Sequence, residues 1–228
     1  MLAQVVLQNP VGGACIGPDV AEWDAGRRLS ALPMPGVRMT FARGEEIFGD
    51  GEPADHVYRV ISGAVRTYRM LSDGRRLISD FHLVGDFFGL EMGQEHRIGA
   101  EAIGDTEVLA VRRSTLNRRA AEDCDLSSQV WRLTADSLER TREHALLLGR
   151  QGACERVCAF LLDLADRLDQ PADLTLPMSR QDMADYLGLT IETVSRTLTQ
   201  LQAWNWIALP AVRRIVFTDR AAMHRLCC

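Results

Sequence analysis

One short segment, residues 179–201, restricts the fold more than any other part of the chain. Ser179 lies three residues before Asp182, the spacing at which a hydroxyl and a carboxylate cap the first amides of a helix. Gly188 then permits a left-handed turn, and Thr190 is placed to cap a second helix directly after it. Two short helices joined by a tight turn that contains glycine form a helix-turn-helix.

The second of these helices is expected to have two different faces. Three apolar residues at i, i+4 and i+7 form the face expected to be buried: Val194, Leu198 and Leu201. A polar face near the helix N-terminus carries Glu192, Ser195 and Arg196. Arginine donates to guanine O6 and N7, and glutamate accepts from the cytosine amino group, so this face predicts DNA base reading in the major groove. A plain surface ion pair between Glu192 and Arg196 is the alternative.

The residues after this helix predict a β-hairpin. Residues 207–210 and 215–217 flank Val212, Arg213 and Arg214, so two arginines are expected at the hairpin tip. A helix-turn-helix followed by such a hairpin is a winged helix, and exposed wing arginines neutralise DNA phosphates without reading sequence. The residues predicted to contact the DNA backbone are Ser179, Arg180, Thr190, Thr193, Thr199, Arg213 and Arg214.

Most of the first half of the chain predicts short strands. Gly63, Gly74 and Gly85 are eleven residues apart, and residues 57–61 and 65–68 are rich in β-branched and aromatic side chains. Many short strands at this spacing indicate a sandwich or a barrel.

A long helix is predicted between these two parts, because residues 125–148 contain neither glycine nor proline. Small or apolar residues recur every three or four positions, so this helix is expected to connect the domains and to pair with its own copy. A helix that lies on its own domain is the alternative. The predicted dimerisation residues are Val130, Leu133, Ser137, Leu138, Thr141, Ala145 and Leu148.

The order of these elements, together with the sequence G-L-T-I-E-T-V-S-R at residues 188–196, resembles the CRP/FNR superfamily and most closely its FixK branch. The resemblance covers nearly everything after residue 30. It implies a homodimer that pairs through the long helix, reads a TTGAT-type palindrome with Glu192, Ser195 and Arg196, and recruits RNA polymerase as an activator. It also implies a role in microoxic respiration and nitrogen fixation.

The expected fold class is therefore α+β, in four parts. These are an N-terminal arm at residues 1–26, a cyclic-nucleotide-binding-like β-roll at 27–118, a dimerisation helix at 119–149, and a winged helix-turn-helix DNA-binding domain at 150–228.

The sequence leaves open whether the β-roll binds an effector. His96 and Arg97 stand where cyclic-AMP-binding relatives have an Arg-Ser pair that grips the phosphate, so we expect a regulator that needs no small molecule. The alternative is an effector-dependent sensor that binds a nucleotide or haem in the roll, with His82, His96 and His144 as candidate haem ligands.

The cysteines do not predict a cofactor or a metal site. Iron-sulfur relatives use three cysteines clustered near the N-terminus, where this chain has only Cys15. Cys154 and Cys158 are spaced as i and i+4 but have no nearby histidine, which favours buried side chains over metal ligands. All six cysteines are expected as thiols in a reducing cytosol, and redox control through Cys227 and Cys228 stays open.

The charge distribution and the motifs of the chain restrict its class of function further. The net charge is −5, but six arginines face only four acidic residues from residue 178 onward, so a polyanion contact is expected at that end. The chain shows no basic and apolar leader and no long apolar run, which predicts a cytoplasmic protein with no membrane partner. No catalytic motif is present, so we expect no enzyme.

Overall fold

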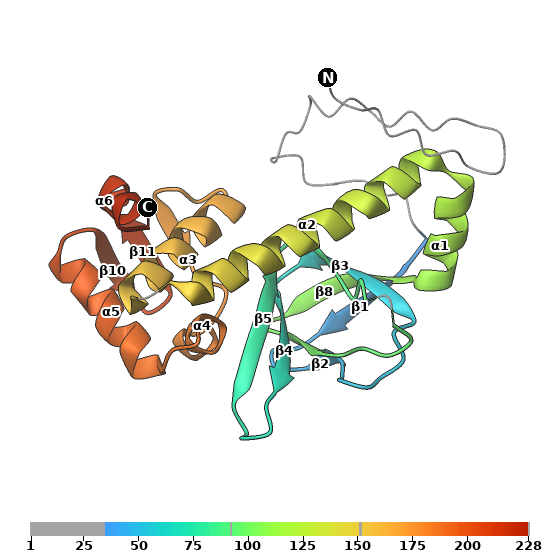
Figure 1. Ribbon diagram of the computed structural model, residues 1–228, viewed down its shortest axis with the longest axis horizontal. Coiled ribbons are helices and arrows are strands. Elements are labelled where there is room, and N and C mark those ends of the chain that lie inside the picture. Colours follow the sequence, from blue (N-terminus) through green and yellow to red (C-terminus); the bar gives the residue numbers. More distant parts are fainter. Residues whose placement is uncertain (1–34, 92, 151, 228) are drawn as a thin grey trace.

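The computed structural model describes residues 35–91, 93–150 and 152–227, so the predicted N-terminal arm lies outside the described residues. The α+β fold is confirmed, and Figure 1 shows a β-roll, a long diagonal helix and a C-terminal helical unit. The elements of the β-roll are β1 (Val37–Phe41), β2 (Glu46–Phe48), β3 (His56–Ser62), β4 (Val65–Met70), β5 (Arg76–His82), β6 (Phe87–Phe88), β7 (Gly99–Ala102) and β8 (Thr106–Arg112). The elements that follow are α1 (Arg113–Glu122), α2 (Cys124–Gly149), α3 (Ala153–Arg167), β9 (Asp173–Thr175), α4 (Arg180–Leu187), α5 (Ile191–Ala203), β10 (Ile207–Ala211), β11 (Arg214–Phe217) and α6 (Arg220–Cys227).

The β-roll consists of two four-stranded antiparallel sheets, with strand orders β1-β8-β3-β6 and β2-β7-β4-β5. Its turns explain the spacing of two of the glycines. Gly63 joins β3 to β4 with a φ of 81°, and a Cβ there would lie 2.5 Å from the carbonyl oxygen of Asp105. Gly74 has a φ of 82° in the turn between β4 and β5. Both positions need a left-handed backbone, which only glycine adopts readily.

The long helix α2 begins at Cys124 rather than near residue 119. Asp123 has an extended backbone that ends α1, and its side chain accepts hydrogen bonds from the amides of Asp125 and Leu126. The 26 residues of α2 span about 39 Å at 1.5 Å per residue. The helix therefore reaches from α1, beside the roll, to the C-terminal unit, as Figure 1 shows.

The C-terminal unit has its own core, which continues into the roll. β9, β10 and β11 form an antiparallel sheet in the order β10-β11-β9, and α6, which the sequence patterns did not predict, packs against α3. Phe81 of β5 lies 5.1 Å from Tyr186 of α4 and 6.0 Å from Phe160 of α3, measured between ring centroids. This aromatic contact attaches the helix-turn-helix directly to the roll.

Within the described ranges, none of the helices combines the length and apolar character needed to cross a bilayer.

Candidate nucleic-acid interface

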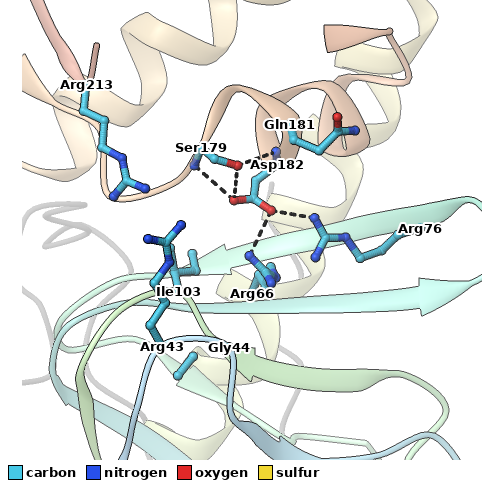
Figure 2. A pocket seen from close by; sticks show the side chains of 10 residues that line it. Arg43, Gly44, Arg66, Arg76, Ile103, Ser179, Gln181, Asp182 and Arg213 are labelled. Atoms are coloured by element: carbon cyan, nitrogen blue, oxygen red, sulfur yellow. Dashed lines mark hydrogen bonds and ion pairs between the residues drawn. The ribbon is translucent and has the colours of Figure 1, made fainter. Parts of the chain in front are cut away.

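The first helix of the helix-turn-helix, α4, begins with the predicted cap. The amide of Asp182 donates to Ser179 Oγ at 3.1 Å, and the Asp182 carboxylate accepts from the amide of Ser179 at 3.0 Å, as drawn in Figure 2. This reciprocal arrangement satisfies two amides that the helix itself leaves without partners. The start of α4 is therefore fixed by two side chains that are close together in sequence.

The turn between the helices has the geometry that the sequence predicts. Gly188 has φ 62° and ψ 38°, the left-handed conformation that ends α4. Thr190 then caps α5 by accepting a hydrogen bond of 3.2 Å from the amide of Thr193, and Leu189 packs against the core. These contacts set the direction in which α5 leaves the turn.

Helix α5 buries one face and exposes the predicted reading face. Val194, Leu198 and Leu201 are each at most 1% exposed. Glu192 and Arg196 are exposed, and Ser195 between them is half-buried. The structure thus brings all three predicted base-reading residues to one accessible surface close to the N-terminus of the helix.

Local contacts keep Glu192 ionised and position the side chains of Arg180 and Thr199 on this surface. A hydrogen bond from its own backbone amide, a second from the Thr190 hydroxyl and the charge of Arg196 lower the pKa of Glu192 below its usual value. Arg180 of α4 donates from Nη1 to Ser195 Oγ at 3.5 Å, while its Nε is buried without a partner in this part of the chain. Thr199 donates its hydroxyl to the Ser195 carbonyl oxygen at 3.1 Å, so that hydroxyl already has an acceptor. The surface therefore carries an ionised carboxylate and two guanidinium groups.

The wing differs from the predicted hairpin in one respect. Arg214 is the first residue of strand β11 and does not lie at the tip. Its guanidinium group pairs with both carboxylate oxygens of Asp173 on the neighbouring strand β9. The prediction that both arginines form the tip is wrong, because β10 extends to Ala211, which is paired with Arg214. Val212 and Arg213 form the exposed tip.

Sequence reasoning missed the contacts that join this unit to the roll. Arg66 of β4 and Arg76 of β5 both donate to Asp182 Oδ1, at 2.9 and 2.7 Å, and Arg76 also donates to Asp185 at 2.9 Å. Residues more than 100 positions apart meet in these ion pairs, and nothing in the local pattern around either partner predicts them.

The stripe predicted for dimerisation is divided between two environments. Val130 and Leu133 pack on the core of their own roll, as the alternative interpretation expects. Leu138 is 50% exposed, and Thr141 and Ala145 are exposed as well. Ser137 and Leu148 are half-buried, and Trp131, which the sequence pattern did not select, is 75% exposed. Five exposed residues follow the spacing of a heptad repeat, and we name this set the α2 stripe: Trp131, Thr134, Leu138, Thr141 and Ala145.

The interior of the roll contains a cluster of packed aromatic rings. His96 is 1% exposed, its ring lies 3.6 Å from that of Phe48, and its Nδ1 lies 3.3 Å from Glu91 Oε2. The ring of Phe48 is tilted against that of Tyr58 at a centroid distance of 5.4 Å, and the ring of Tyr58 stacks on that of Phe88 at 5.2 Å. Protein side chains therefore occupy the region in which the resemblance places a phosphate-binding pair.

Neither ring nitrogen of His96 has a hydrogen-bond partner among the described residues, whereas one ring nitrogen of each of the other two candidate ligands contacts a protein oxygen. His82 Nε2 lies 3.2 Å from Thr67 Oγ1, and His144 Nε2 lies 2.8 Å from the carbonyl oxygen of Tyr186, on whose ring it stacks. No set of three or more potential metal ligands occurs in the described part of the chain.

The cysteines differ from the prediction at one position. Cys154, Cys158 and Cys227 are thiols, and Cys158 is fully buried. Cys124 is disulfide-bonded, so the prediction of thiols throughout is wrong there, because its exposed position at the start of α2 leaves it accessible to a second thiol. Cys15 and Cys228 lie outside the described residues.

Comparison with known proteins assigns the family. Residues 155–226 match the Crp-like helix-turn-helix domain, and residues 38–123 match the cyclic nucleotide-binding domain. The nitrogen fixation regulation protein FixK of Azorhizobium caulinodans is 47% identical over 212 residues, which are 91% of this chain and 86% of that protein. The chain belongs to the FixK family of CRP/FNR-type transcription regulators.

Further relatives agree with this assignment. FixK of Rhizobium meliloti is 44% identical over 87% of this chain and 92% of its own length. The structure of FixK2 from Bradyrhizobium japonicum superposes with a TM-score of 0.81 at 48% identity, covering 85% of this chain and 98% of that one. As a FixK-type regulator the chain is a transcription regulator with a DNA-binding helix-turn-helix, and these relatives confirm the prediction that it is not an enzyme.

Proposed function

We propose that this regulator is a homodimeric transcription activator that reads a TTGAT-type palindrome with Glu192, Ser195 and Arg196. The observation that carries the proposal is the placement of these three residues on one accessible face of α5, near its N-terminus, with the apolar face of the same helix fully buried. Residues near the N-terminus of a recognition helix are the ones that meet base edges in the major groove.

The chemistry of the three side chains fits this role. Arg196 carries two donors suited to guanine O6 and N7, and the ionised Glu192 is an acceptor suited to the cytosine amino group. Glu192 has a lowered pKa, so it stays a charged acceptor throughout the neutral range. Ser195 is already oriented by Arg180, whose buried Nε has no protein partner among the described residues and whose charge suits a nearby phosphate.

Contacts to the DNA backbone are proposed for residues that surround this face. Thr190, Thr193 and Thr199 lie on α5 or at its cap, Ser179 and Arg180 lie at the start of α4, and Arg213 forms the wing tip. Arg214 contributes less than Arg213, because Asp173 already neutralises its guanidinium group. Such contacts supply affinity and register but no sequence information.

The α2 stripe is the proposed dimer interface. Thr134 and Thr141 donate their hydroxyls to backbone carbonyl oxygens of the same helix, at 3.0 and 2.9 Å, so mainly their methyl groups remain to face a partner. Trp131 and Leu138 add the large exposed apolar surface that a paired helix would bury. A twofold dimer presents two copies of α5 about 34–36 Å apart, which matches one turn of DNA and a palindromic site.

The buried aromatic cluster around His96 supports a regulator that acts without an effector. A nucleotide phosphate in the region of His96 would have to displace a buried ring stacked on Phe48. Isothermal titration calorimetry with cyclic nucleotides distinguishes this from the alternative of an effector-dependent sensor. We expect no binding heat and the same DNA affinity with or without nucleotide, whereas micromolar binding coupled to DNA affinity would establish a sensor.

The cellular role is proposed from the relatives. Two FixK proteins that regulate nitrogen fixation, by their names, share 47% and 44% identity with this chain over most of its length. We infer a cytoplasmic activator of genes for nitrogen fixation and microoxic respiration that recruits RNA polymerase. Selection of binding sites from random duplexes by the purified, ligand-free protein tests the proposal, with recovery of TTGAT palindromes expected and recovery of unrelated sequences contradicting it.

A further inference from the structure

We propose that a cavity between the β-roll and the winged helix is a binding site for a phosphate group. The cavity has a volume of about 230 Å³ and is lined by side chains of the roll and of the C-terminal unit. We name it the junction cavity, and its charged or polar lining residues are Arg43, Arg66, Arg76, Ser179, Gln181, Asp182 and Arg213 (Figure 2).

Two of the four arginines are fixed and neutralised by carboxylates. Arg66 is held by Glu101 at 2.6 Å and by Asp182 at 2.9 Å, and Arg76 is held by Asp182 at 2.7 Å. Among the described residues, Asp182 is the only carboxylate that lines the cavity, and both of its oxygens already accept hydrogen bonds. No carboxylate in the described lining is therefore left without a partner to bind a cation.

The other two arginines are not neutralised. Among the described residues, Arg43 in the turn between β1 and β2 makes no hydrogen bond or ion pair, and Arg213 makes only one bond of 3.4 Å, to the carbonyl oxygen of Pro177. Figure 2 shows their guanidinium groups facing each other across the opening of the cavity. Two like charges brought together without a counterion repel, and an anion bound between them would replace this repulsion with two attractions.

A phosphate group is the anion that fits this arrangement best. Guanidinium groups recognise phosphate through pairs of parallel hydrogen bonds, and a tetrahedral phosphate has enough oxygens to accept from both Arg43 and Arg213. The aspartate that would otherwise compete is held by Arg66, Arg76 and Ser179.

The phosphate has two possible sources with the same chemistry. One is the backbone of bound DNA, because Ser179 and Arg213, which we assign to backbone contacts, also line the cavity. In that case the roll itself, through Arg43, holds DNA, and the inference rests on the proposed function. The other source is a free phosphate or phosphorylated solute, which would bridge the roll and the winged helix and needs no DNA.

The test compares the full-length wild type with Arg43→Gln, Arg43→Lys and the control Arg75→Gln. Arg75 is an exposed arginine of the same roll outside the cavity, so its substitution removes the same charge elsewhere. For the DNA source, Arg43→Gln should lower the slope of log affinity against log salt by about 0.9 per protomer, the value for one phosphate that the protein no longer neutralises. Wild type, Arg43→Lys and Arg75→Gln should share the steeper slope.

If the bound group is a free phosphate, inorganic phosphate should raise the thermal unfolding midpoint in the absence of DNA and at constant ionic strength. The rise should be larger for the wild type and for Arg75→Gln than for Arg43→Gln. A difference in either measurement supports the site and identifies the source. Equal salt slopes together with equal phosphate effects for Arg43→Gln and Arg75→Gln would overturn it. A wild type that fails to bind the palindrome counts against the proposed function instead and leaves the phosphate measurement valid.

Discussion

Asp182 Oδ1 in α4 lies 2.9 Å from Arg66 Nη1 in β4, although 116 positions separate the two residues in the chain. The same carboxylate caps α4 through Ser179, so one side chain fixes both the start of the helix-turn-helix and its attachment to the roll. Asp182 is 4% exposed and Arg66 13%, which places the pair in a largely desolvated position. The orientation of α5 relative to the roll therefore depends on an ion pair that is costly to break.

Replacing Asp182 with asparagine tests this attachment. The amide oxygen still accepts from Ser179, but Arg66 and Arg76 lose a charged partner. We expect the free energy of unfolding to fall by about 1.5–3 kcal/mol, the range for hydrogen bonds to charged groups, as measured by urea denaturation. Asp73→Asn, which breaks an exposed pair with Arg75, is the control and should leave the midpoint unchanged. Equal midpoints for both variants would rule out a structural role for the Asp182 pair.

The pH dependence of stability should report on His82. Burial lowers the pKa of this imidazole, and although the nearby Asp80 raises it, the burial effect is larger. The unfolded state takes up a proton near pH 6.5 while the folded state does not, so stability is lost as the pH falls below about 6.5, by at most about 1.4 kcal/mol per pH unit. His82→Gln keeps a partner for Thr67 and cannot titrate, so its urea midpoint should fall less between pH 7.5 and pH 5.5. The same fall in both proteins would show that His82 is protonated when folded.

Asp80 lies beside His82, and its titration should change the stability of the protein only at acid pH. Burial raises the pKa of this carboxyl, but the charge of His82 when it is protonated and the charges of Arg167 and Arg140 outweigh burial and lower it. Its contribution to stability is present above the unfolded value of 3.8 and is lost as the pH falls through the lower folded value. The titration of Asp80 therefore does not interfere with the measurement on His82 above pH 5.5.

The two wing arginines should behave differently. Arg213→Ala is expected to weaken binding to all DNA sequences alike and to reduce the salt slope by about one for each phosphate that is no longer neutralised. Arg214→Ala should reduce the slope less, because Asp173 already neutralises Arg214 in the free protein. Fluorescence anisotropy titrations at several salt concentrations measure both slopes. Identical reductions would mean that Arg214 leaves Asp173 on binding.

The α2 stripe predicts the oligomeric state. Leu138→Arg places a charge in the middle of the exposed apolar surface and should convert the dimer into a monomer at micromolar concentration in sedimentation velocity experiments. Glu139→Arg introduces the same side chain at the neighbouring exposed position, outside the stripe, and should remain dimeric. A Leu138→Arg variant that still sediments as a dimer would place the interface elsewhere.

The sequence predicted local structure well, because its determinants lie close together in the chain. Ser179, Gly188 and Thr190 identified the caps and the turn, and the buried positions on α5 followed from the recurrence of apolar residues every three or four positions of a helix. The prediction for Arg214 was wrong because strands β10 and β11 extend further toward the tip, to the pair of Ala211 with Arg214. The sequence pattern of two strands does not determine where their pairing ends. The contacts of Asp182 with Arg66 and Arg76 depend on how the roll and the winged helix pack together, and the burial of Val130 and Leu133 depends on how α2 packs on the roll. Periodicity within one segment contains no information on either packing.

Base reading by Arg196 is tested most directly by competition binding with a set of duplexes that carry one substituted base pair each. Wild-type protein and Arg196→Ala are compared across the whole set. We predict that the variant binds the cognate palindrome more weakly by about 1–3 kcal/mol and no longer discriminates at one G·C pair of each half-site, while discrimination at the other positions is kept. An unchanged order of preference across all substituted duplexes would contradict the assignment of α5 as the helix that reads DNA sequence.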